Sequence, residues 1–432
     1  MSEWRELKLG ELVNRGLAET RTGPFGTQLH ASDYTAHGTP VINVRNLGFG
    51  DIRAAALERV GVDVQERLAQ HVLVDGDVVF GRKGAVDRHA LVTGRESGWM
   101  QGSDCIRFRL FPGSPIVSRF LSRALLTHRH RAWIDAQCSH GSTMASLNQE
   151  IISRIAIRTP TISTQLRIVS VLDAFDKVIE INEQRIALLE GLARSLYREW
   201  FVHFRFPGHE DVEFVDSELG RIPDGWEVRS SEAVLTPLGG GTPSKKRADY
   251  WNGGLIPWFT PTDLTRSRVR YVADSQSQIT TLGLKESGAR MFPAGSVLMT
   301  SRATLGVLAI ATKESTCNQG FIVIPPVDGI PSEFIYEWLA NHETRLAAIA
   351  TGATFREITK AAFKRFPFLL PTRPVLAMFA EAVGPVGEQI SGYERGNRVL
   401  AATRDLLLPR LVTGRLDISD IDLGGLLTAD AA

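Results

Sequence analysis

The longest regular pattern of apolar positions begins at Ile168 and ends at Trp200. Apolar residues recur there in alternating steps of four and three, the heptad period of a helix that packs along one side against another helix. Asn182 interrupts the pattern. The spacing predicts a helix of about 50 Å at roughly 1.5 Å per residue, with this apolar seam: Ile168, Leu172, Phe175, Ile179, Ile186, Leu189, Ala193, Leu196 and Trp200.

A second stretch near the C-terminus shows the same alternation. It is interrupted at Asn397 and Arg404, and its apolar positions are Phe379, Val383, Val386, Ile390, Tyr393, Leu400, Leu407 and Leu411. Two matching seams favour pairing with each other, although a single amphipathic helix commonly packs on its own globular region instead.

The polar interruptions predict how the two helices pair. A buried asparagine is costly without a hydrogen-bond partner, so we expect Asn182 to face Asn397 in an antiparallel pair. Trp200 then faces Phe379 and Ile168 faces Leu411. The weak point is Arg404, which this register places opposite Phe175. A long arginine side chain could extend outward along that ring.

The remaining sequence repeats itself. Residues 141–160 resemble residues 352–371 at an offset of 211, and other matches precede them with small drifts. Each copy holds short Val- and Ile-rich stretches broken by Gly, Pro, Asp and Asn, which indicate strands, and one helical stretch, near 117–138 and 331–351. The predicted order is a strand-rich domain (1–162), a central helix (163–205), a second strand-rich domain (206–373), a distal helix (374–415) and a tail (416–432).

Composition narrows the function classes. Lys and Arg number 49 against 48 Asp and Glu, so any affinity for nucleic acid must come from local basic patches. The three cysteines, Cys105, Cys138 and Cys317, form no C-x-x-C pair, which excludes a disulfide framework and a zinc finger. The chain shows no signal peptide or bilayer-spanning run. We therefore expect a soluble protein of the reducing cytoplasm, with no metal site; His128 and His130 lack an acidic or cysteine partner nearby.

Several composite motifs occur in a characteristic order. GPFGTQLHASDY starts at Gly23 and is followed by TPVINVRNL. SELGRIPDGWEV starts at Ser217, GGGTPSKKRADYWNGGLIPWFTPTDL at Gly239 and TSRATLGVLAIATKESTCNQGF at Thr300. With the central helix, these motifs make the chain resemble the specificity (S) subunit of type I restriction-modification systems over almost its full length. The first copy departs from the second in having GRKGAVDRHALV where the second has SRATLGVLAIA.

The resemblance implies a mixed α/β (α+β) fold. Two tandem strand-rich target recognition domains would be separated by long helices that form an antiparallel two-helix coiled coil, as a pseudo-twofold repeat with the recognition domains at opposite ends. It also implies a non-catalytic subunit that recognises a bipartite asymmetric site on double-stranded DNA. Two methyltransferase (M) subunits would bind the helices, and restriction and motor (R) subunits would join them. S-adenosylmethionine and ATP would belong to these partners, and no membrane is involved.

Other functions remain open. The chain could be the specificity subunit of a related non-type-I DNA-modification system, or a coiled-coil scaffold without DNA binding. A nuclease or methyltransferase would need its own site, but the sequence holds no G-x-x-x-x-G-K-[ST] loop and no N-P-P-Y motif.

A DNA-binding role suggests candidate contacts, because cations bind phosphates whereas amide and guanidinium groups bind base edges. Arg266, Arg268 and Arg270 alternate, so a strand would direct all three to one face. Isolated surface cations are often merely solvated or ion-paired. The candidates for DNA contact are Gln28, His30, Asn43, Arg45, Asn46, Arg82, Lys83, Lys245, Lys246, Arg247, Thr262, Arg266, Arg268, Arg270 and Arg302.

Four apolar residues of the central helix lie off the seam, and they are Leu188, Leu192, Tyr197 and Phe201. They are candidates for binding a methyltransferase subunit, and packing against the adjacent globular domain is the equal alternative.

Overall fold

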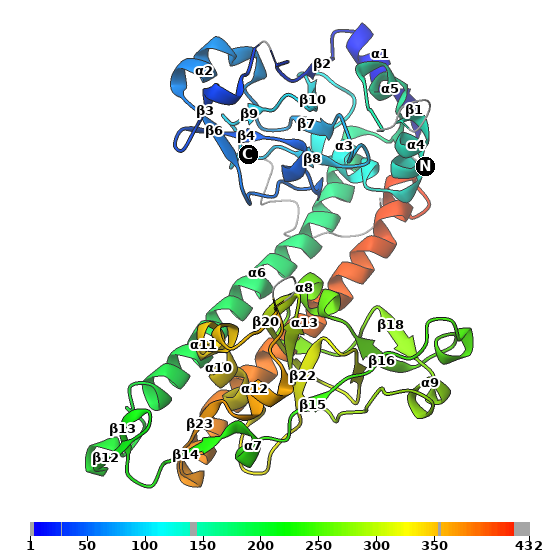
Figure 1. Ribbon diagram of the computed structural model, residues 1–432. Coiled ribbons are helices and arrows are strands. Elements are labelled where there is room, and N and C mark those ends of the chain that lie inside the picture. The colour runs from blue at the N-terminus through cyan, green and yellow to red at the C-terminus, as the bar shows by residue number, and fades with distance from the viewer. Residues whose placement is uncertain (1–3, 27, 139–144, 353–355, 419–432) are drawn as a thin grey trace. The chain divides into compact units, whose positions relative to one another are not determined.

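The computed structural model describes residues 4–26, 28–138, 145–352 and 356–418. Its contacts divide the chain into two units (Figure 1). Unit 1 holds residues 1–178 and 399–432, and unit 2 holds residues 179–398. Most of the predicted tail and part of each repeated segment lie outside the described residues. Of the helices in the described ranges, none combines the length and the apolar composition needed to cross a bilayer.

Unit 1 is built on a five-stranded sheet whose order is β2-β10-β7-β8-β5. All pairs in it are antiparallel except β5 with β8. Its strands are β2 (Ala18–Thr22), β5 (Phe49–Gly50), β7 (Val78–Gly81), β8 (His89–Leu91) and β10 (Cys105–Leu110). A four-stranded sheet of order β3-β6-β4-β9 and the pair β1-β11 complete the unit; these strands are β1 (Arg5–Lys8), β3 (Tyr34–Thr35), β4 (Thr39–Ile42), β6 (Glu58–Val60), β9 (Met100–Gln101) and β11 (Ala156–Thr159).

Unit 2 repeats this topology. Its five-stranded sheet has the order β15-β22-β19-β20-β17, again antiparallel except for the last pair. A three-stranded sheet, β18-β16-β21, matches β6-β4-β9, and β14 pairs with β23 as β1 does with β11. The strands are β14 (Glu227–Ser230), β15 (Leu238–Gly239), β16 (Ile256–Phe259), β17 (Tyr271–Val272), β18 (Ser277–Ile279), β19 (Val297–Arg302), β20 (Thr304–Ala311), β21 (Thr316–Cys317), β22 (Phe321–Ile324) and β23 (Pro367–Leu370), with an added hairpin of β12 (Phe214–Ser217) and β13 (Gly220–Pro223).

Short helices flank the sheets in both units. Unit 1 has α1 (Leu9–Asn14), α2 (Val62–Arg67), α3 (Ser118–Leu125), α4 (His128–Cys138) and α5 (Gln149–Arg154). Unit 2 has α7 (Ser231–Val234), α8 (Pro261–Ser267), α9 (Thr281–Lys285), α10 (Ser332–Asn341), α11 (Glu343–Ala348) and α12 (Lys360–Lys364). The prediction of two tandem strand-rich domains with the same fold is therefore confirmed.

Two helices of 40 residues follow the strand-rich parts, α6 (Ile162–Phe201) and α13 (Arg373–Val412). In unit 2, Asn182 Nδ2 donates a hydrogen bond of 2.8 Å to Asn397 Oδ1, and the Trp200 and Phe379 rings lie 5.7 Å apart. Residue numbers rise along one helix as they fall along the other, so this pairing is antiparallel. The structure brings together the two asparagines on which the predicted register depends.

In unit 1 the same helices meet around Ile168, Leu172 and Leu411, which are buried in one apolar cluster. Arg404, which the predicted register places opposite Phe175, bonds to Asp176, the next residue of α6, at 2.5 Å. A carboxylate one residue beyond the apolar seam therefore neutralises the charge that the seam could not accommodate.

Candidate nucleic-acid interface

Five loops of unit 1 meet beside the ends of β2, β7 and β10. We call residues 22–26, 28, 43–46, 82–84, 101–104 and 145–149 loop cluster 1. Backbone hydrogen bonds tie these loops together: Gly23 N–H donates to Cys105 O at 2.9 Å, Gly102 N–H to Ile42 O at 2.9 Å, and Leu147 N–H to Arg82 O at 2.8 Å. A Cβ on Gly23 would lie 1.9 Å from Gly102 O, so only glycine permits this approach.

Unit 2 carries a similar framework. Loop cluster 2 consists of residues 239–246, 259–262, 300–303, 317–320 and 357–360. Its ties are Gly241 N–H to Cys317 O at 2.9 Å, Asn318 N–H to Phe259 O at 2.9 Å and Ile358 N–H to Ser301 O at 2.9 Å. The loops enclose a cavity of about 220 Å³, lined in part by Arg302, Gln319 and Lys360. Two equivalent surfaces of exposed polar loops therefore exist, one in each unit.

The predicted basic cluster of loop cluster 2 divides into two kinds of cation. Lys245 and Lys246 are exposed, and neither makes an ion pair or side-chain hydrogen bond with any residue that the structure describes. Arg247 is instead engaged: its guanidinium donates to both Asp249 oxygens, at 2.9 and 2.6 Å, and lies 4.4 Å from the Tyr250 ring centre. The hydrogen bonds to Asp249 raise the pKa of Arg247 above its usual value. The two lysines are free to bind phosphates, whereas Arg247 must first leave its partner.

The prediction that Arg266, Arg268 and Arg270 share one face of a strand is wrong. Residues Pro261 to Ser267 form α8, because Thr260 and Asp263 close a capping box and Pro261 occupies the first turn. Arg266 is exposed on that helix, and Arg268 ends it in the left-handed conformation with φ of 50°. Arg270 is buried in the unit, with its side chain 1% exposed and bonded to Glu337 at 2.6 Å. Arg270 is therefore withdrawn from the set of DNA contacts.

The other candidates of unit 2 lie in loop cluster 2. Thr262 is exposed near the start of α8. Arg302, at the end of β19, forms an ion pair of 3.1 Å with Glu357 and remains half exposed. Arg302 also lines the cavity, so a ligand covering the cavity could contact this side chain.

The candidates of unit 1 are similarly mixed. Gln28 and His30 are exposed. The Arg82 guanidinium lies 5.0 Å from the Phe25 ring centre, and Lys83 lies 3.6 Å from Asp104. These four side chains belong to loop cluster 1 or adjoin it, and all can be approached from solvent.

Contacts within unit 1 engage Asn43, Arg45 and Asn46 to different degrees. Asn43 donates to Glu58 at 2.6 Å, and the half-exposed Arg45 pairs with the same carboxylate at 2.8 Å. Asn46 is fully buried and donates to the carbonyls of Arg53 and Ala55, both at 3.1 Å. An enclosed amide cannot contact a base edge, so the prediction that Asn46 contacts DNA is wrong, and this residue has a structural role.

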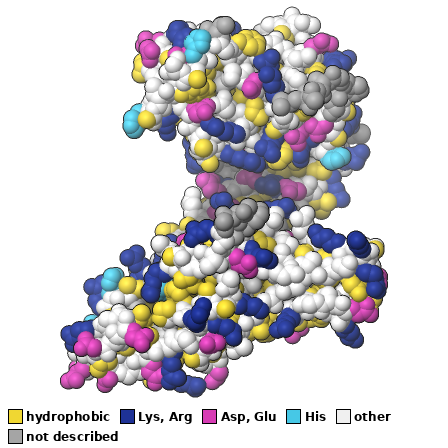
Figure 2. Space-filling view, viewed as in Figure 1, with side chains coloured by type: hydrophobic (Ala, Val, Ile, Leu, Met, Phe, Trp, Pro, Cys, Tyr) yellow, Lys and Arg dark blue, Asp and Glu magenta, His cyan; other side chains and the backbone are white. Residues whose placement is uncertain are grey.

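Sequence reasoning missed three exposed polar residues of the two clusters. Gln319 accepts a hydrogen bond from Thr242 at 2.6 Å, Gln149 donates one to Thr22 at 3.0 Å, and Lys360 lines the cavity. The signal that could have found Gln149 and Lys360 was the repeat itself, because they occupy equivalent positions at the offset of 211. On the face in Figure 2, Lys and Arg are spread over both units among Asp and Glu.

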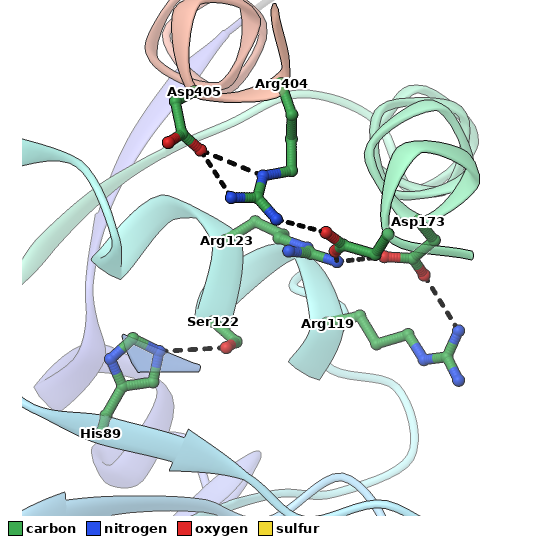
Figure 3. Close-up of polar contacts among 8 residues, drawn as sticks. His89, Arg119, Ser122, Arg123, Asp173, Arg404 and Asp405 are labelled. Atoms are coloured by element: carbon green, nitrogen blue, oxygen red, sulfur yellow. Dashed lines mark hydrogen bonds and ion pairs between the residues drawn. The ribbon is translucent and has the colours of Figure 1, made fainter. Parts of the chain in front are cut away.

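Each unit also has a charged cluster where its strand-rich part meets the long helices. In unit 1, Arg123 of α3 bonds to Asp173 at 2.6 Å (Figure 3). Arg123 also bonds to Asp176, which in turn binds Arg404. Arg119 adds a bond of 3.1 Å to Asp173. These groups remain about a fifth to a third exposed, apart from the more exposed Arg119.

The cluster of unit 2 is buried. Glu394 of α13 accepts the backbone N–H groups of Arg270 and Tyr271, at 2.6 and 2.9 Å, and the Arg270 guanidinium binds Glu337 of α10. Burial raises the pKa of Glu394 to about 7 despite these two donors; Glu190 adds to the rise and Arg398 opposes it. The strand-rich part of unit 2 is thus anchored to its helix by desolvated charge.

The described residues contain no group of three His, Cys, Asp or Glu side chains placed to hold a metal ion. His130 is half-buried and bonds to Thr127 at 2.7 Å and to the Ala156 carbonyl at 3.0 Å. Burial lowers the pKa of His89 to about 4, beside Ser122 at 3.0 Å (Figure 3).

Known proteins resemble the chain over most of its length. Residues 1–191 and 223–374 match the family described as the type I restriction modification DNA specificity domain. The type I restriction enzyme MjaIX specificity subunit of Methanocaldococcus jannaschii is 35% identical over 204 residues, which is 46% of this chain and 46% of that subunit. The HindI specificity subunit of Haemophilus influenzae is 22% identical over 336 residues, 64% of this chain and 72% of that one. The chain thus spans about half the length of the first relative and more of the second.

A solved structure supports the fold. The S subunit of the type I restriction-modification system from M. genitalium aligns with a TM-score of 0.57 at 13% identity, covering 95% of this chain and 96% of that one. A likeness at this identity bears on architecture alone. The family match over most of the chain agrees with the duplicated domains and paired helices, and the chain belongs to the family of type I restriction-modification DNA specificity subunits.

Proposed function

We propose that this chain selects the DNA sequence for a type I restriction-modification complex and has no catalytic role of its own. Each loop cluster contacts one half of a bipartite asymmetric site on double-stranded DNA. The observation that carries the proposal is the duplicated framework with unlike exposed side chains, because two copies of one framework can hold different base-contacting groups in the same geometry.

In this proposal residues 1–162 and 206–373 are the two target recognition domains, and residues 163–205 and 374–415 are the spacer helices. The remaining DNA contacts are the predicted residues other than Asn46 and Arg270. They divide into phosphate-binding cations, such as Lys245 and Lys246, and candidate base-contacting groups, such as Gln28, His30 and Thr262. Phosphate contacts provide affinity and orientation, and base contacts provide sequence preference.

The proposal includes the partners that the family resemblance implies. Two methyltransferase subunits bind the long helices, and restriction subunits join that complex; S-adenosylmethionine and ATP are bound by these partners. Of the four off-seam residues proposed for this contact, Leu188 and Leu192 are 75% and 47% exposed, whereas Tyr197 and Phe201 are buried. The last two pack inside unit 2, so the partner surface is restricted to the exposed leucines.

The phosphate contacts are tested by a mobility shift of the complex on DNA at several salt concentrations. Replacing Lys245 and Lys246 with alanine should weaken binding on all sequences and reduce the salt slope by roughly 2, because each phosphate contact releases about one counterion. The control replaces Arg15 and Arg129, two exposed cations outside both loop clusters. If the wild-type complex binds no DNA at any salt concentration, the result would favour a scaffold without DNA affinity.

A further inference from the structure

One pair of positions differs in chemistry between two otherwise matching frameworks. Strand pairing sets Thr22 opposite Ile106 in unit 1 and Gly239 opposite Ile322 in unit 2, and the adjoining pairs, Cys105 with Gly81 and Phe321 with Thr300, hold the same relation. Thr22 and Gly239 are therefore equivalent. Each is the last residue of its strand, beside its loop cluster.

The partner position follows from the caps of two short helices. In unit 1 the Asn148 side chain accepts the Ile151 N–H at 2.8 Å, and in unit 2 the Thr359 side chain accepts the Ala362 N–H at 3.1 Å. Each capping residue directly follows a residue whose backbone N–H donates to a carbonyl at the end of a neighbouring strand. The next residue begins each helix: it is Gln149 in α5 and Lys360 in α12.

The two members of each pair touch. Gln149 Nε2 donates to Thr22 Oγ1 at 3.0 Å. In unit 2 a Cβ on Gly239 would lie 3.0 Å from Lys360 Nζ and 3.3 Å from its Cε, so the missing side chain makes room for the lysine. The strand residue thus suits the helix residue in each unit: a hydroxyl positions the amide, and a glycine admits the longer cation. Gln149 and Lys360 are both exposed.

We infer that positions 149 and 360 determine base preference, one in each half of the DNA site; this inference rests on the proposed function. With one amide hydrogen bonded to Thr22, Gln149 keeps a second N–H and its carbonyl oxygen, the donor and acceptor that match N7 and N6 of adenine. Lys360 offers only donors, which match N7 and O6 of guanine. Thr22 is a positioning residue for Gln149.

The experiment coexpresses the full chain with its methyltransferase partner in a host without this modification and determines the modified motif by methylation-aware sequencing. Lys360→Gln should lower the preference for a G·C pair at one position of one half-site, roughly 5- to 150-fold. Gln149→Ala should weaken the preference for an A·T pair in the other half-site. Exchanging whole pairs, Thr22→Gly with Gln149→Lys, should introduce a preference for G·C there.

Controls separate preference from charge and folding. Lys364→Gln removes the same charge at the far end of α12, where the lysine lies 3.4 Å from Glu232, and should leave the motif unchanged. Arg154→Ala is the matching control at the far end of α5 and should also leave the motif unchanged. If the paired exchange fails to yield a folded complex, the single substitutions at exposed Lys360 and Gln149 decide the question.

The outcomes distinguish two failures. A wild-type complex that modifies no bipartite motif contradicts the proposed function. A wild-type bipartite motif that stays unchanged in Lys360→Gln and Gln149→Ala overturns this inference alone. A decrease in modification by the variants that is equal on all sequences, with the motif unchanged, also overturns the inference. A phosphate contact or a structural role would produce that result.

Discussion

Both units join a strand-rich part to the same two helices through charged residues, yet they do so in different environments. In unit 1, Arg123, Asp173, Asp176 and Arg404 keep contact with solvent. In unit 2, Arg270 and Glu337 are 1% and 2% exposed. Ion pairs in water contribute little to stability, whereas a buried charge is costly once its partner is removed. Equal folds can therefore carry junctions of unequal strength and unequal sensitivity to salt and pH.

The largest expected effect is the loss of the buried pair in unit 2. Glu337→Ala leaves the Arg270 guanidinium buried without its carboxylate, and we expect unit 2 to lose about 3 to 5 kcal/mol. Hydrogen exchange of unit 2 peptides in a urea series measures this loss. Glu232→Ala, which removes the exposed partner of Lys364, is the control and should cost about 1 kcal/mol or less. Equal losses would remove the contrast between buried and exposed pairs.

A pH dependence should be found in unit 2 through Glu394. Its pKa rises from 4.5 to about 7 on folding, so between these values the folded state binds more protons than the unfolded state. This residue's contribution to stability therefore falls as pH rises from 4.5 to 7, by roughly 3 kcal/mol in total. Glu394→Gln should flatten that part of the stability profile of unit 2. A wild-type profile identical to that of the variant would contradict the assignment.

The asparagine pair of unit 2 tests how the helices keep their register. Asn182→Leu removes the hydrogen-bond partner of the partly buried Asn397 amide and should cost roughly 1 to 2 kcal/mol. Asn182→Leu with Asn397→Leu should recover most of that stability while allowing other registers. Cysteine crosslinking between α6 and α13 would detect them. A double variant that is less stable than either single one would argue against direct pairing.

The smallest effect is expected at the junction of unit 1. Arg123→Ala removes two partly exposed ion pairs, and because Arg404 still binds Asp176, the cost should be about 1 kcal/mol. The loss should shrink in high salt, which screens such charges. Hydrogen exchange of unit 1 peptides at low and high salt measures it. A large, salt-independent loss would place this junction in the same class as that of unit 2.

The sequence was most informative where structure is local or periodic. The heptad seams and the single asparagine in each seam predicted the pairing of α6 with α13, and internal similarity predicted the duplicated fold. The arginines near α8 were misassigned because alternation was weighed above the Thr260 and Asp263 capping box, which is also visible in the sequence. At this position the helix-capping signal predicts the local structure better than strand alternation does.

The rest depends on contacts between distant residues. Arg270 is buried because Glu337 and Glu394, 67 and 124 residues further on, meet it in space. Asn46 is enclosed by carbonyls of its own loop, and Tyr197 and Phe201 pack on Phe334 of α10. Single-residue chemistry cannot separate such buried polar or aromatic groups from exposed ones, so the candidate site was predicted only as a set of loops.

The most direct test of the account is the DNA motif modified by the wild-type complex, determined by methylation-aware sequencing of the genome in which it acts. Two recognition domains of the same fold with unlike loop clusters predict two unrelated short half-sites, separated by unspecified base pairs, with centres about one DNA turn of ~34 to 36 Å apart. One continuous palindromic motif would contradict the assignment of one half-site to each unit.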